Sequence, residues 1–355
     1  MSSANGRIFY FDALRAVAIL CVVLLHVTGH LGEMMSYNVH TIYSFSGIFE
    51  TFSNNFFRIG IALFLMLSGA LLLGRDWDIR SFLSKRVPRI VKPFLFWSLV
   101  FSILLIVASY FVPSISFVKH FAIWDMLMVF WNTLMCKAPG SAVYWFFWMM
   151  LGVYLIMPVF NKWVKHAELS ELEYFLVIWM ISTLFDYTLM MQCPIKLSYF
   201  TSPIGFVVLG YYLRYSERRI FNGRLISWIL IIVPAVLMLI YSYLVVDKTI
   251  LFEFHRYSIP VIVEATGVFC LFKTSTYLNE IPFSIKRFIS SVAMCSYGMY
   301  LIHSQIIMII RKILHLSFNF TLDYTILFVA GFVLSWAIIY ILAKIPFIDE
   351  YIGVK

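Results

Sequence analysis

Apolar runs recur along the whole chain, and most are about as long as a helix that crosses a membrane. Such a helix needs about 20 apolar residues. The chain has 355 residues, of which 62% are hydrophobic and 13% are charged, and a soluble core of this size cannot bury that excess. The sequence therefore predicts an all-α, polytopic integral membrane protein with about ten transmembrane helices in a single domain, 1–355. The ten runs lie within Phe9–Gly29, Phe56–Gly74, Val91–Val112, Ala142–Asn161, Leu172–Met191, Tyr199–Leu213, Leu225–Val246, Tyr257–Phe272, Ile289–Ile310 and Asp323–Ala343, the sixth and eighth being short.

The basic residues predict the orientation of these helices. If the N-terminus is cytoplasmic, most lysines and arginines fall on the cytoplasmic side, as the positive-inside rule requires. Both termini are therefore expected in the cytoplasm, and the net charge of +9 does not point to nucleic acid. The apolar stretch Phe117–Met135 could be an eleventh span. Because that would place the Arg214–Arg224 cluster outside, we interpret it as an interfacial or re-entrant segment on the outer face, with Trp124 and Trp131 at headgroup level.

Few other features suggest processing, cofactors or additional domains. Asp12 and Arg15 interrupt the start of the first run, which is expected to stay in the mature protein rather than be cleaved as a signal peptide. No linker, repeat or appended soluble domain is evident. Cys136 and Cys193 fall on predicted outer loops and could pair in an oxidising compartment. No CxxC motif or His-rich tract indicates a metal site.

Seven ionisable residues lie within the predicted spans, where each costs about 2.5–3.5 kcal/mol and is a functional candidate. Arg15 and His26 are eleven positions apart on the first helix. This spacing is about three turns and roughly 16 Å, which places both side chains on one face at different depths. The two histidines and two carboxylates at similar depth in the outer half suggest a general base with an orienting partner. The seven residues are Asp12, Arg15, His26, Arg58, Asp186, Glu264 and His303.

Simpler interpretations remain open for all of these residues except Glu264, whose short span leaves it little room to reach water. Asp12 and Arg15 can anchor a helix end by snorkelling, and Arg58 and Asp186 can do the same at the outer interface. An intramembrane histidine is often only hydrogen-bonded to a neighbouring helix. The inner loop Arg75–Lys92 is either a topology signal or a phosphate clamp. The outer aromatic run from Tyr144 to Trp148 is either an interfacial belt or a sugar-stacking surface.

Four motifs, in order along the chain, resemble those of acyltransferase family 3, whose membrane enzymes O-acylate bacterial glycans. FYFDALRAVAILCVVLLH resembles the first span, with its Arg-x10-His motif at Arg15 and His26. FRIGIALFLMLSGALLL resembles the second span, with Ser68 and Gly69, and the Arg-x-x-Arg motif follows at Arg86 and Arg89. The later matches are VYWFFWMMLGVYLIMPVF, with Trp145, Phe146, Tyr154 and Pro158, and SYGMYLIH, with Ser296, Tyr297, Tyr300 and His303. Arg58 departs from the mostly apolar second span of the family.

The resemblance implies an O-acyltransferase of the bacterial inner membrane. Its donor substrate would be cytoplasmic acyl-CoA, most often acetyl-CoA, with no permanently bound cofactor, and its acceptor a glycan hydroxyl. Arg86, Arg89 and Arg15 would hold the donor phosphates. His26 would act as general base or acyl carrier, with His303 or Glu264 orienting it or moving its proton.

Our own candidates for binding the acceptor are Trp145, Arg58 and Asp186, which the predicted topology places toward the outer side. The length of the chain and the lack of an extra domain look most like the enterobacterial common antigen O-acetyltransferase type. A rival interpretation is a proton-coupled transporter or lipid-linked glycan flippase, in which the same buried groups form a proton relay. The sequence does not indicate the oligomeric state.

Overall fold

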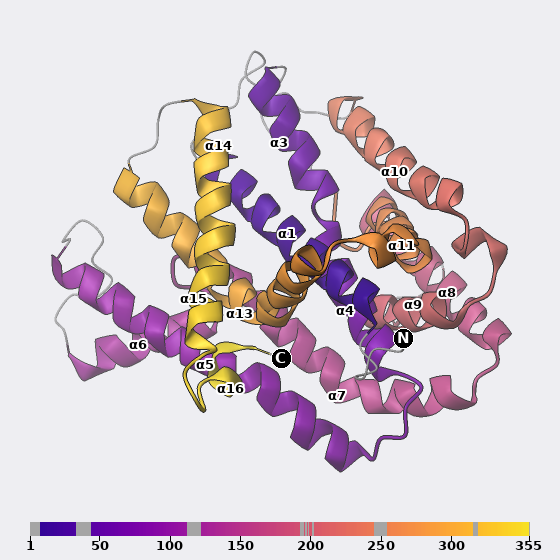
Figure 1. Cartoon of the computed structure of the whole chain (residues 1–355), viewed down its shortest axis with the longest axis horizontal. Helices are drawn as coiled ribbons and strands as arrows, with labels where there is room; N and C mark the ends of the chain where they lie inside the picture. The colour runs from indigo at the N-terminus through magenta and orange to yellow at the C-terminus, as the bar shows by residue number, and fades with distance from the viewer. Residues whose placement is uncertain are drawn as a thin grey trace. The chain divides into compact units, whose positions relative to one another are not determined.

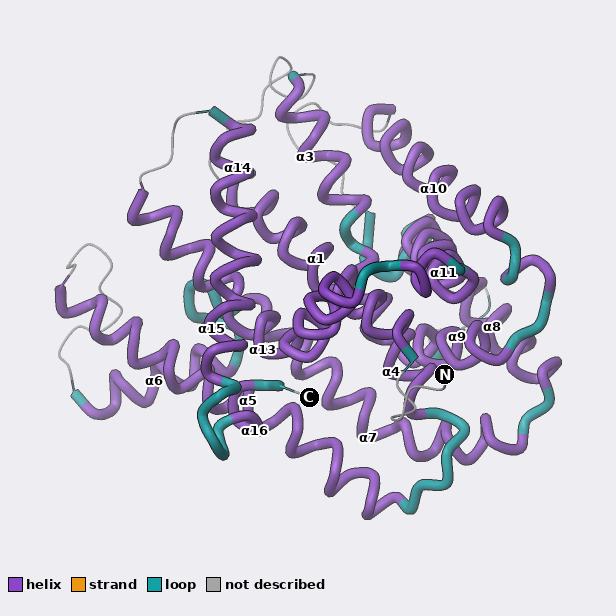
Figure 2. The backbone as a smooth tube through the Cα atoms, viewed as in Figure 1, coloured by secondary structure: helices purple, strands orange, loops and turns teal. Residues whose placement is uncertain are grey.

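The computed structural model describes residues 8–32, 44–111, 122–191, 195, 197, 199–200, 202–244, 254–314 and 319–354. These residues form helices joined by short loops and contain no β-strand, which confirms the all-α prediction (Figure 2). Eight helices among them are long and apolar enough to cross a membrane, so the polytopic prediction is also confirmed. The eight are Phe9–Gly32, Phe45–Leu72, Ile79–Phe111, Ala142–His166, Leu169–Leu189, Arg224–Tyr241, Phe283–Leu314 and Phe320–Leu342.

The two short runs also form helices. They are α9 (Ile204–Tyr215, 12 residues) and α11 (Ile259–Thr274, 16 residues). At 1.5 Å per residue they are about 18 and 24 Å long, less than the hydrocarbon thickness of about 30 Å. The total of ten spans and the side on which the termini lie therefore stay predictions.

The chain folds as two compact units, and Figure 1 labels most of their helices. Unit 1 comprises Met1–Asp76 and Met157–Ala293, and unit 2 comprises Trp77–Ile156 and Met294–Lys355. Unit 1 holds α1 (Phe9–Gly32), α3 (Phe45–Phe56), α4 (Ile59–Leu72), α8 (Leu169–Thr183), the π-helix η3 (Leu184–Leu189), α9, the 3₁₀ turn η4 (Arg219–Phe221), α10 (Arg224–Leu244), α11 and α12 (Tyr277–Glu280). Unit 2 holds α5 (Ile79–Phe111), α6 (Ile123–Leu134), the 3₁₀ turn η2 (Ala142–Tyr144), α14 (Phe320–Val329), the π-helix η5 (Ala330–Leu334), α15 (Ser335–Leu342) and α16 (Asp349–Ile352). The unit boundaries fall within α7 (Trp145–His166) and α13 (Phe283–Leu314).

Glycines bring α4 and α9 of unit 1 into direct backbone contact. A Cβ atom on Gly69 would lie 1.7 Å from the carbonyl oxygen of Val207, and one on Gly210 would lie 1.9 Å from that of Met66. Only glycine permits this approach, and small residues at helix crossings are the usual basis of packing in membranes. Because α1 packs against α4 in turn, this crossing helps to position the candidate residues of α1.

The second predicted run was too short at its start. The structure has a helical stretch from Phe45 to Leu72 that bends at Phe57 and Arg58, between α3 and α4. The sequence interpretation placed α3 in a loop because polar residues interrupt its hydropathy. Five of them are nonetheless buried: Glu50, Thr51, Ser53, Asn54 and Asn55.

In unit 2, α5 begins at Ile79, so residues 79–92 are helical and the prediction of a loop at Arg75–Lys92 was wrong for them. Their basic side chains hid an amphipathic helix that buries Phe82 and Ile90. The C-terminal α16 packs on this helix: the indole Nε1 of Trp97 donates to the carbonyl of Ile352 at 3.3 Å, and Lys92 forms an ion pair with Glu350 at 2.5 Å.

The segment considered as an eleventh span contains α6, whose 12 residues are about 18 Å long. It packs against α5 through Ser102 and Thr133, whose hydroxyls are 3.0 Å apart. Trp124 and Trp131 are exposed, at 77% and 54%. A helix this short with exposed indoles suits the interfacial interpretation, and its place in a membrane stays a prediction.

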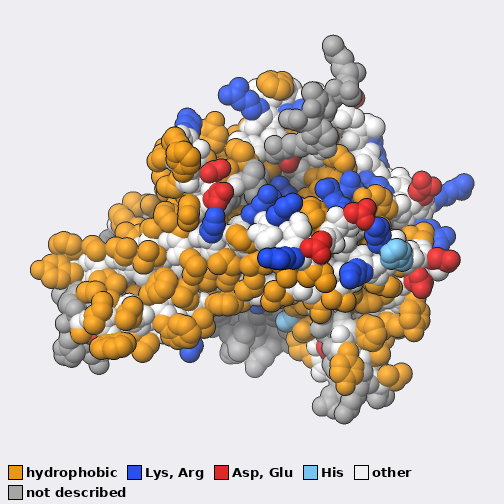
Figure 3. Space-filling model, turned by 90° about the horizontal axis from the view of Figure 1, so that it is seen from below, with side chains coloured by type: hydrophobic (Ala, Val, Ile, Leu, Met, Phe, Trp, Pro, Cys, Tyr) orange, Lys and Arg blue, Asp and Glu red, His pale blue; other side chains and the backbone are white. Residues whose placement is uncertain are grey.

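Exposed apolar side chains agree with a lipid-facing surface. In unit 1, α10 exposes Trp228, Ile232, Val236 and Ile240 on one side, while Met238 on the other is buried. Hydrophobic side chains also cover much of the surface visible in Figure 3. In water such a surface would promote aggregation, whereas in a bilayer it is solvated by lipid.

Candidate functional site

His26 lies on α1, and a hydrogen bond to the backbone carbonyl of Val22, one turn earlier, orients its ring. Its Nδ1 atom is 2.7 Å from the carbonyl oxygen of Val22. A carbonyl can only accept, so Nδ1 carries the proton and Nε2 keeps its lone pair. The His26 side chain is partly buried. This tautomer can accept a proton, or attack an acyl carbon, through Nε2.

Three basic groups of unit 1 lie within electrostatic range of His26. Arg58, between α3 and α4, Arg256, in the segment before α11, and His30, one turn along α1, all interact with it electrostatically. The sequence predicts Arg58 and His26 at similar depth, and the two side chains interact electrostatically in the structure. Arg256 was missed, because in the sequence it is only one more outer basic residue. Positive groups at such a position can stabilise the negative oxygen that develops during acyl transfer.

Arg15 occupies the same continuous helix, about three turns before His26, so the spacing derived from the sequence holds. Other cations lie around this end of α1. The Arg214 guanidinium is 5.1 Å from the centre of the Phe11 ring, and the Lys286 ammonium is 5.6 Å from that of Phe9. Asp12 is buried and accepts a hydrogen bond from the Ser290 hydroxyl at 3.0 Å. The start of α1 is therefore a basic end with the charge that phosphate groups require.

Glu264 of α11 is completely buried and faces α1. Its carboxylate interacts electrostatically with Cys21, five residues before His26, and both its oxygens lack a hydrogen-bond partner among the described residues. The Val22 carbonyl, rather than Glu264, contacts Nδ1 of His26. The role of Glu264 in orienting His26 or moving its proton stays a prediction.

Asp186 lies in the π-helix η3, a type of helix often found at functional sites. The Tyr187 ring next to it stacks on His255, with centroids 4.1 Å apart and planes 8° from parallel. The Thr188 hydroxyl accepts a hydrogen bond from the Ile259 amide at 2.9 Å, which ties η3 to the start of α11. Burial, and then the charges of Arg256 and Arg58, lower the pKa of His255 to about 4.

The candidate residues on α7 and α13 belong to unit 2. His303 is fully buried, with Nδ1 2.8 Å from the carbonyl oxygen of Tyr300. The Tyr300 hydroxyl donates to the carbonyl of Val143, and its ring lies 4.7 Å from that of Phe146. Trp145 is the first residue of α7 and lies in sequence between Val143 and Phe146, the two residues that Tyr300 contacts. Two motifs far apart in the sequence, around Trp145 and around His303, therefore pack together.

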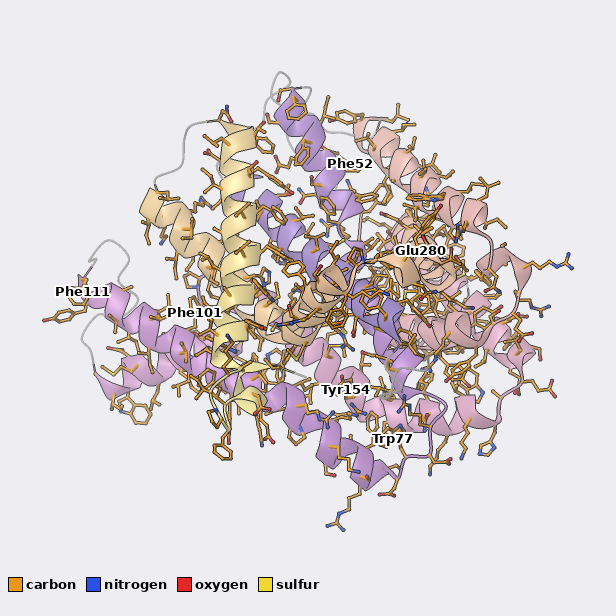
Figure 4. The ribbon with its side chains drawn as sticks, in the orientation of Figure 1. Phe52, Trp77, Phe101, Phe111, Tyr154 and Glu280 are labelled. Carbon is orange, nitrogen blue, oxygen red and sulfur yellow. The ribbon has the colours of Figure 1, made fainter. Side chains whose placement is uncertain are left out.

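Arg86 and Arg89 lie three residues apart near the start of α5 and so share a helix face. Arg86 is half-buried, with its guanidinium 5.3 Å from the centre of the Trp77 ring, and Arg89 is exposed. Trp77 and Tyr154, both labelled in Figure 4, each pack edge-on against Phe82. Two adjacent guanidinium groups, one stacked on an indole, suit a phosphate clamp.

Cys136, one of the two cysteines that could pair, is a free thiol in the structure, and Cys193 lies outside the described residues.

The fold and these side chains define a multi-pass helical membrane protein with ionisable groups on buried helix faces. The family model described as an acyltransferase domain, that of acyltransferase family 3, matches residues 8–340, and the chain belongs to this family. It is a membrane acyltransferase. No curated protein and no solved structure matches the chain.

Proposed function

We propose that the chain transfers an acyl group, most often acetyl, from acyl-CoA to a hydroxyl of a cell-surface glycan or its lipid-linked precursor in the bacterial inner membrane. The observation that carries the proposal is the bond from Nδ1 of His26 to the Val22 carbonyl, which leaves a lone pair on Nε2 for the proposed role of base. Membership of acyltransferase family 3 supports the reaction class. The enterobacterial common antigen type finds no support in the comparisons, so the acceptor is proposed only as a glycan.

The chemistry follows from the position of that nitrogen. Nε2 of His26 takes the proton of the acceptor hydroxyl while the hydroxyl oxygen attacks the carbonyl carbon of the thioester. The resulting oxyanion collapses, the carbon–sulfur bond breaks, and the CoA thiolate leaves and takes the proton from His26. Arg58 and Arg256 carry the positive charge that would stabilise the oxyanion. In the alternative route, Nε2 itself accepts the acyl group first and passes it to the hydroxyl.

The remaining candidate residues divide between the two substrates. Arg15, Arg86 and Arg89 are proposed to bind the CoA phosphates, since guanidinium groups bind phosphate oxygens in pairs. For the acceptor we propose Asp186, Arg58 and Trp145. His303 and Glu264 are proposed to orient His26 or to carry its proton onward.

The test uses the purified chain in lipid nanodiscs with acetyl-CoA. An acyltransferase binds acetyl-CoA and slowly releases the free CoA thiol even without acceptor, and both are measured by calorimetry and a thiol reagent. A proton-coupled transporter or flippase does neither. Lack of both binding and thiol release in a folded preparation would rule out the enzyme, and proton flux in proteoliposomes would then support the transporter.

A further inference from the structure

Unit 2 contains an apolar cavity of about 190 Å³ among α5, η2, α13 and α15. Three of its lining residues, Leu104, Ile309 and Ile338, are 49%, 38% and 39% exposed, so the cavity opens on the apolar outer surface of this unit. An apolar cavity of about 150 Å³ is large enough to bind benzene. The cavity of unit 2 can therefore hold part of a hydrocarbon chain.

Gln305 of α13 also lines this cavity, and it is the residue that an apolar wall does not explain. Its side chain is 5% exposed, and neither its amide nitrogen nor its amide oxygen has a hydrogen-bond partner among the described residues. A buried amide without a partner is destabilising, and lipid tails at the mouth of the cavity supply none. Because the outer torsion angle of glutamine rotates over a broad range, the amide can turn toward a polar group that enters the cavity.

Lys312 follows Gln305 by seven residues in the continuous helix α13 and is exposed. Seven residues are almost two full turns, so the two side chains share a helix face with Cα atoms about 10 Å apart. Ile309 lies between them on this face, at the mouth of the cavity. The headgroup region of a bilayer is about 5–8 Å deep on each side. If Lys312 extends to that region, Gln305 lies near its inner boundary, at the depth of lipid ester groups.

We propose that unit 2 binds a glycerophospholipid at this site. One acyl chain enters the cavity, the Gln305 amide donates to the ester carbonyl at the head of that chain, and the Lys312 ammonium pairs with the phosphate a few bonds beyond it. The order of apolar cavity, amide and cation along α13 matches the order of chain, ester and phosphate in such a lipid. This site is separate from the residues proposed for acyl transfer, and the inference does not depend on that reaction.

The test is native mass spectrometry of the full chain in detergent with two added lipids. Dioleoyl phosphatidylglycerol competes with its ether analogue, in which a methylene group replaces each ester carbonyl. We expect the ester lipid to bind about threefold or more tightly, since one additional hydrogen bond contributes about this much. Gln305→Leu, which keeps the size of the side chain and removes its donor, should abolish the preference for the ester lipid.

Two further variants test the other parts of the site. Lys312→Met should weaken binding of both lipids about fivefold, because a lysine near an anionic lipid contributes about 1 kcal/mol. Lys137→Met is the matched control, since it removes another exposed cation of unit 2 and should leave both affinities nearly unchanged. Ile309→Trp places a large ring at the mouth of the cavity and should weaken binding of both lipids.

Equal binding of ester and ether lipid by the wild type, or an ester preference that persists in Gln305→Leu, overturns the inference. If Gln305→Leu fails to fold, Ile309→Trp decides, and unchanged lipid binding in that variant also overturns it. Equal weakening by Lys137→Met would show that Lys312 acts only as unspecific charge. Displacement of the ester lipid by a polyprenyl phosphate, which has no ester, would assign the cavity to a lipid-linked acceptor instead.

Discussion

Replacing His26 by asparagine separates the chemistry of the imidazole from its structural bond. An asparagine on a helix can donate to the carbonyl four residues earlier, as Asn55 does to Thr51 in this protein at 2.9 Å. His26→Asn is therefore expected to keep the bond to Val22 that His26 makes at 2.7 Å, and with it the packing of α1. The substitution removes Nε2 and so leaves no group to take the proton of the hydroxyl.

The expected size of the effect follows from the contribution of a positioned general base, which is typically 10²–10⁴-fold. The loss corresponds to about 2.7–5.5 kcal/mol of transition-state stabilisation. Acyl transfer is measured as release of the CoA thiol in nanodiscs, with thermal unfolding as the check on folding. His26→Asn should unfold within a few degrees of wild type and transfer at 1% of the wild-type rate or less, by the same estimate.

Thr28→Val is the control for this comparison, because the Thr28 hydroxyl, two residues from His26, donates within the helix to Leu24 at 2.9 Å. It should transfer acyl groups at close to the wild-type rate. If His26→Asn folds and keeps more than about a tenth of wild-type activity, the assignment of His26 as base or acyl carrier is wrong.

Three further predictions concern the proposed donor clamp, the segment before α11 and the packing of unit 1. Arg86→Ala combined with Arg89→Ala should weaken acetyl-CoA binding in calorimetry by about 100-fold or more, since each lost charged hydrogen bond contributes about 1.5–3 kcal/mol. The pKa of His255 is lowered to about 4 in the folded protein, so the unfolded state takes up its proton first as the pH falls. The melting temperature should therefore fall between pH 7 and pH 5, and by less in His255→Phe. Gly69→Ala should destabilise the protein by about 1–3 kcal/mol or more in unfolding experiments, because the new Cβ would lie 1.7 Å from the Val207 carbonyl oxygen.

Each of these predictions has a matched control. Lys85→Ala removes a neighbouring exposed cation and should leave acetyl-CoA affinity nearly unchanged. If it weakens binding as much as the Arg86 and Arg89 substitutions do, these arginines contribute only unspecific positive charge. Equal loss of stability with pH in wild type and His255→Phe would show that His255 does not titrate as described. Gly152→Ala adds a methyl group where nothing lies within 4 Å, and it should be as stable as wild type or slightly more so. A Gly69 variant as stable as that control would contradict the close helix crossing.

The sequence alone predicted the features that depend on local pattern. Hydropathy predicted the helical class, and the spacing of Arg15 and His26 predicted a shared helix face that the continuous α1 preserves. The same hydropathy failed where polar residues interrupt a helix. It missed α3 because Glu50 and Asn54 lower its apolar content, although tertiary packing buries both.

The convergence of Arg58 and Arg256 near His26 could not be predicted for a different reason. About 200 residues separate the two arginines in the chain, and they come within electrostatic range of His26 only because α1 and the segment before α11 both pack against α3. No local pattern encodes such a contact. The bond from His26 to Val22 is local, but its direction depends on a side-chain rotamer that sequence spacing does not specify.

The most direct measurement is a structure of the protein in a lipid nanodisc with a non-hydrolysable acetyl-CoA analogue bound. The proposed mechanism predicts CoA phosphates against arginine side chains such as Arg15 and the acyl carbonyl carbon within about 6 Å of Nε2 of His26, which leaves room for one acceptor hydroxyl between them. An analogue bound with its acyl group away from His26, or on a surface that α1 does not reach, would contradict the account.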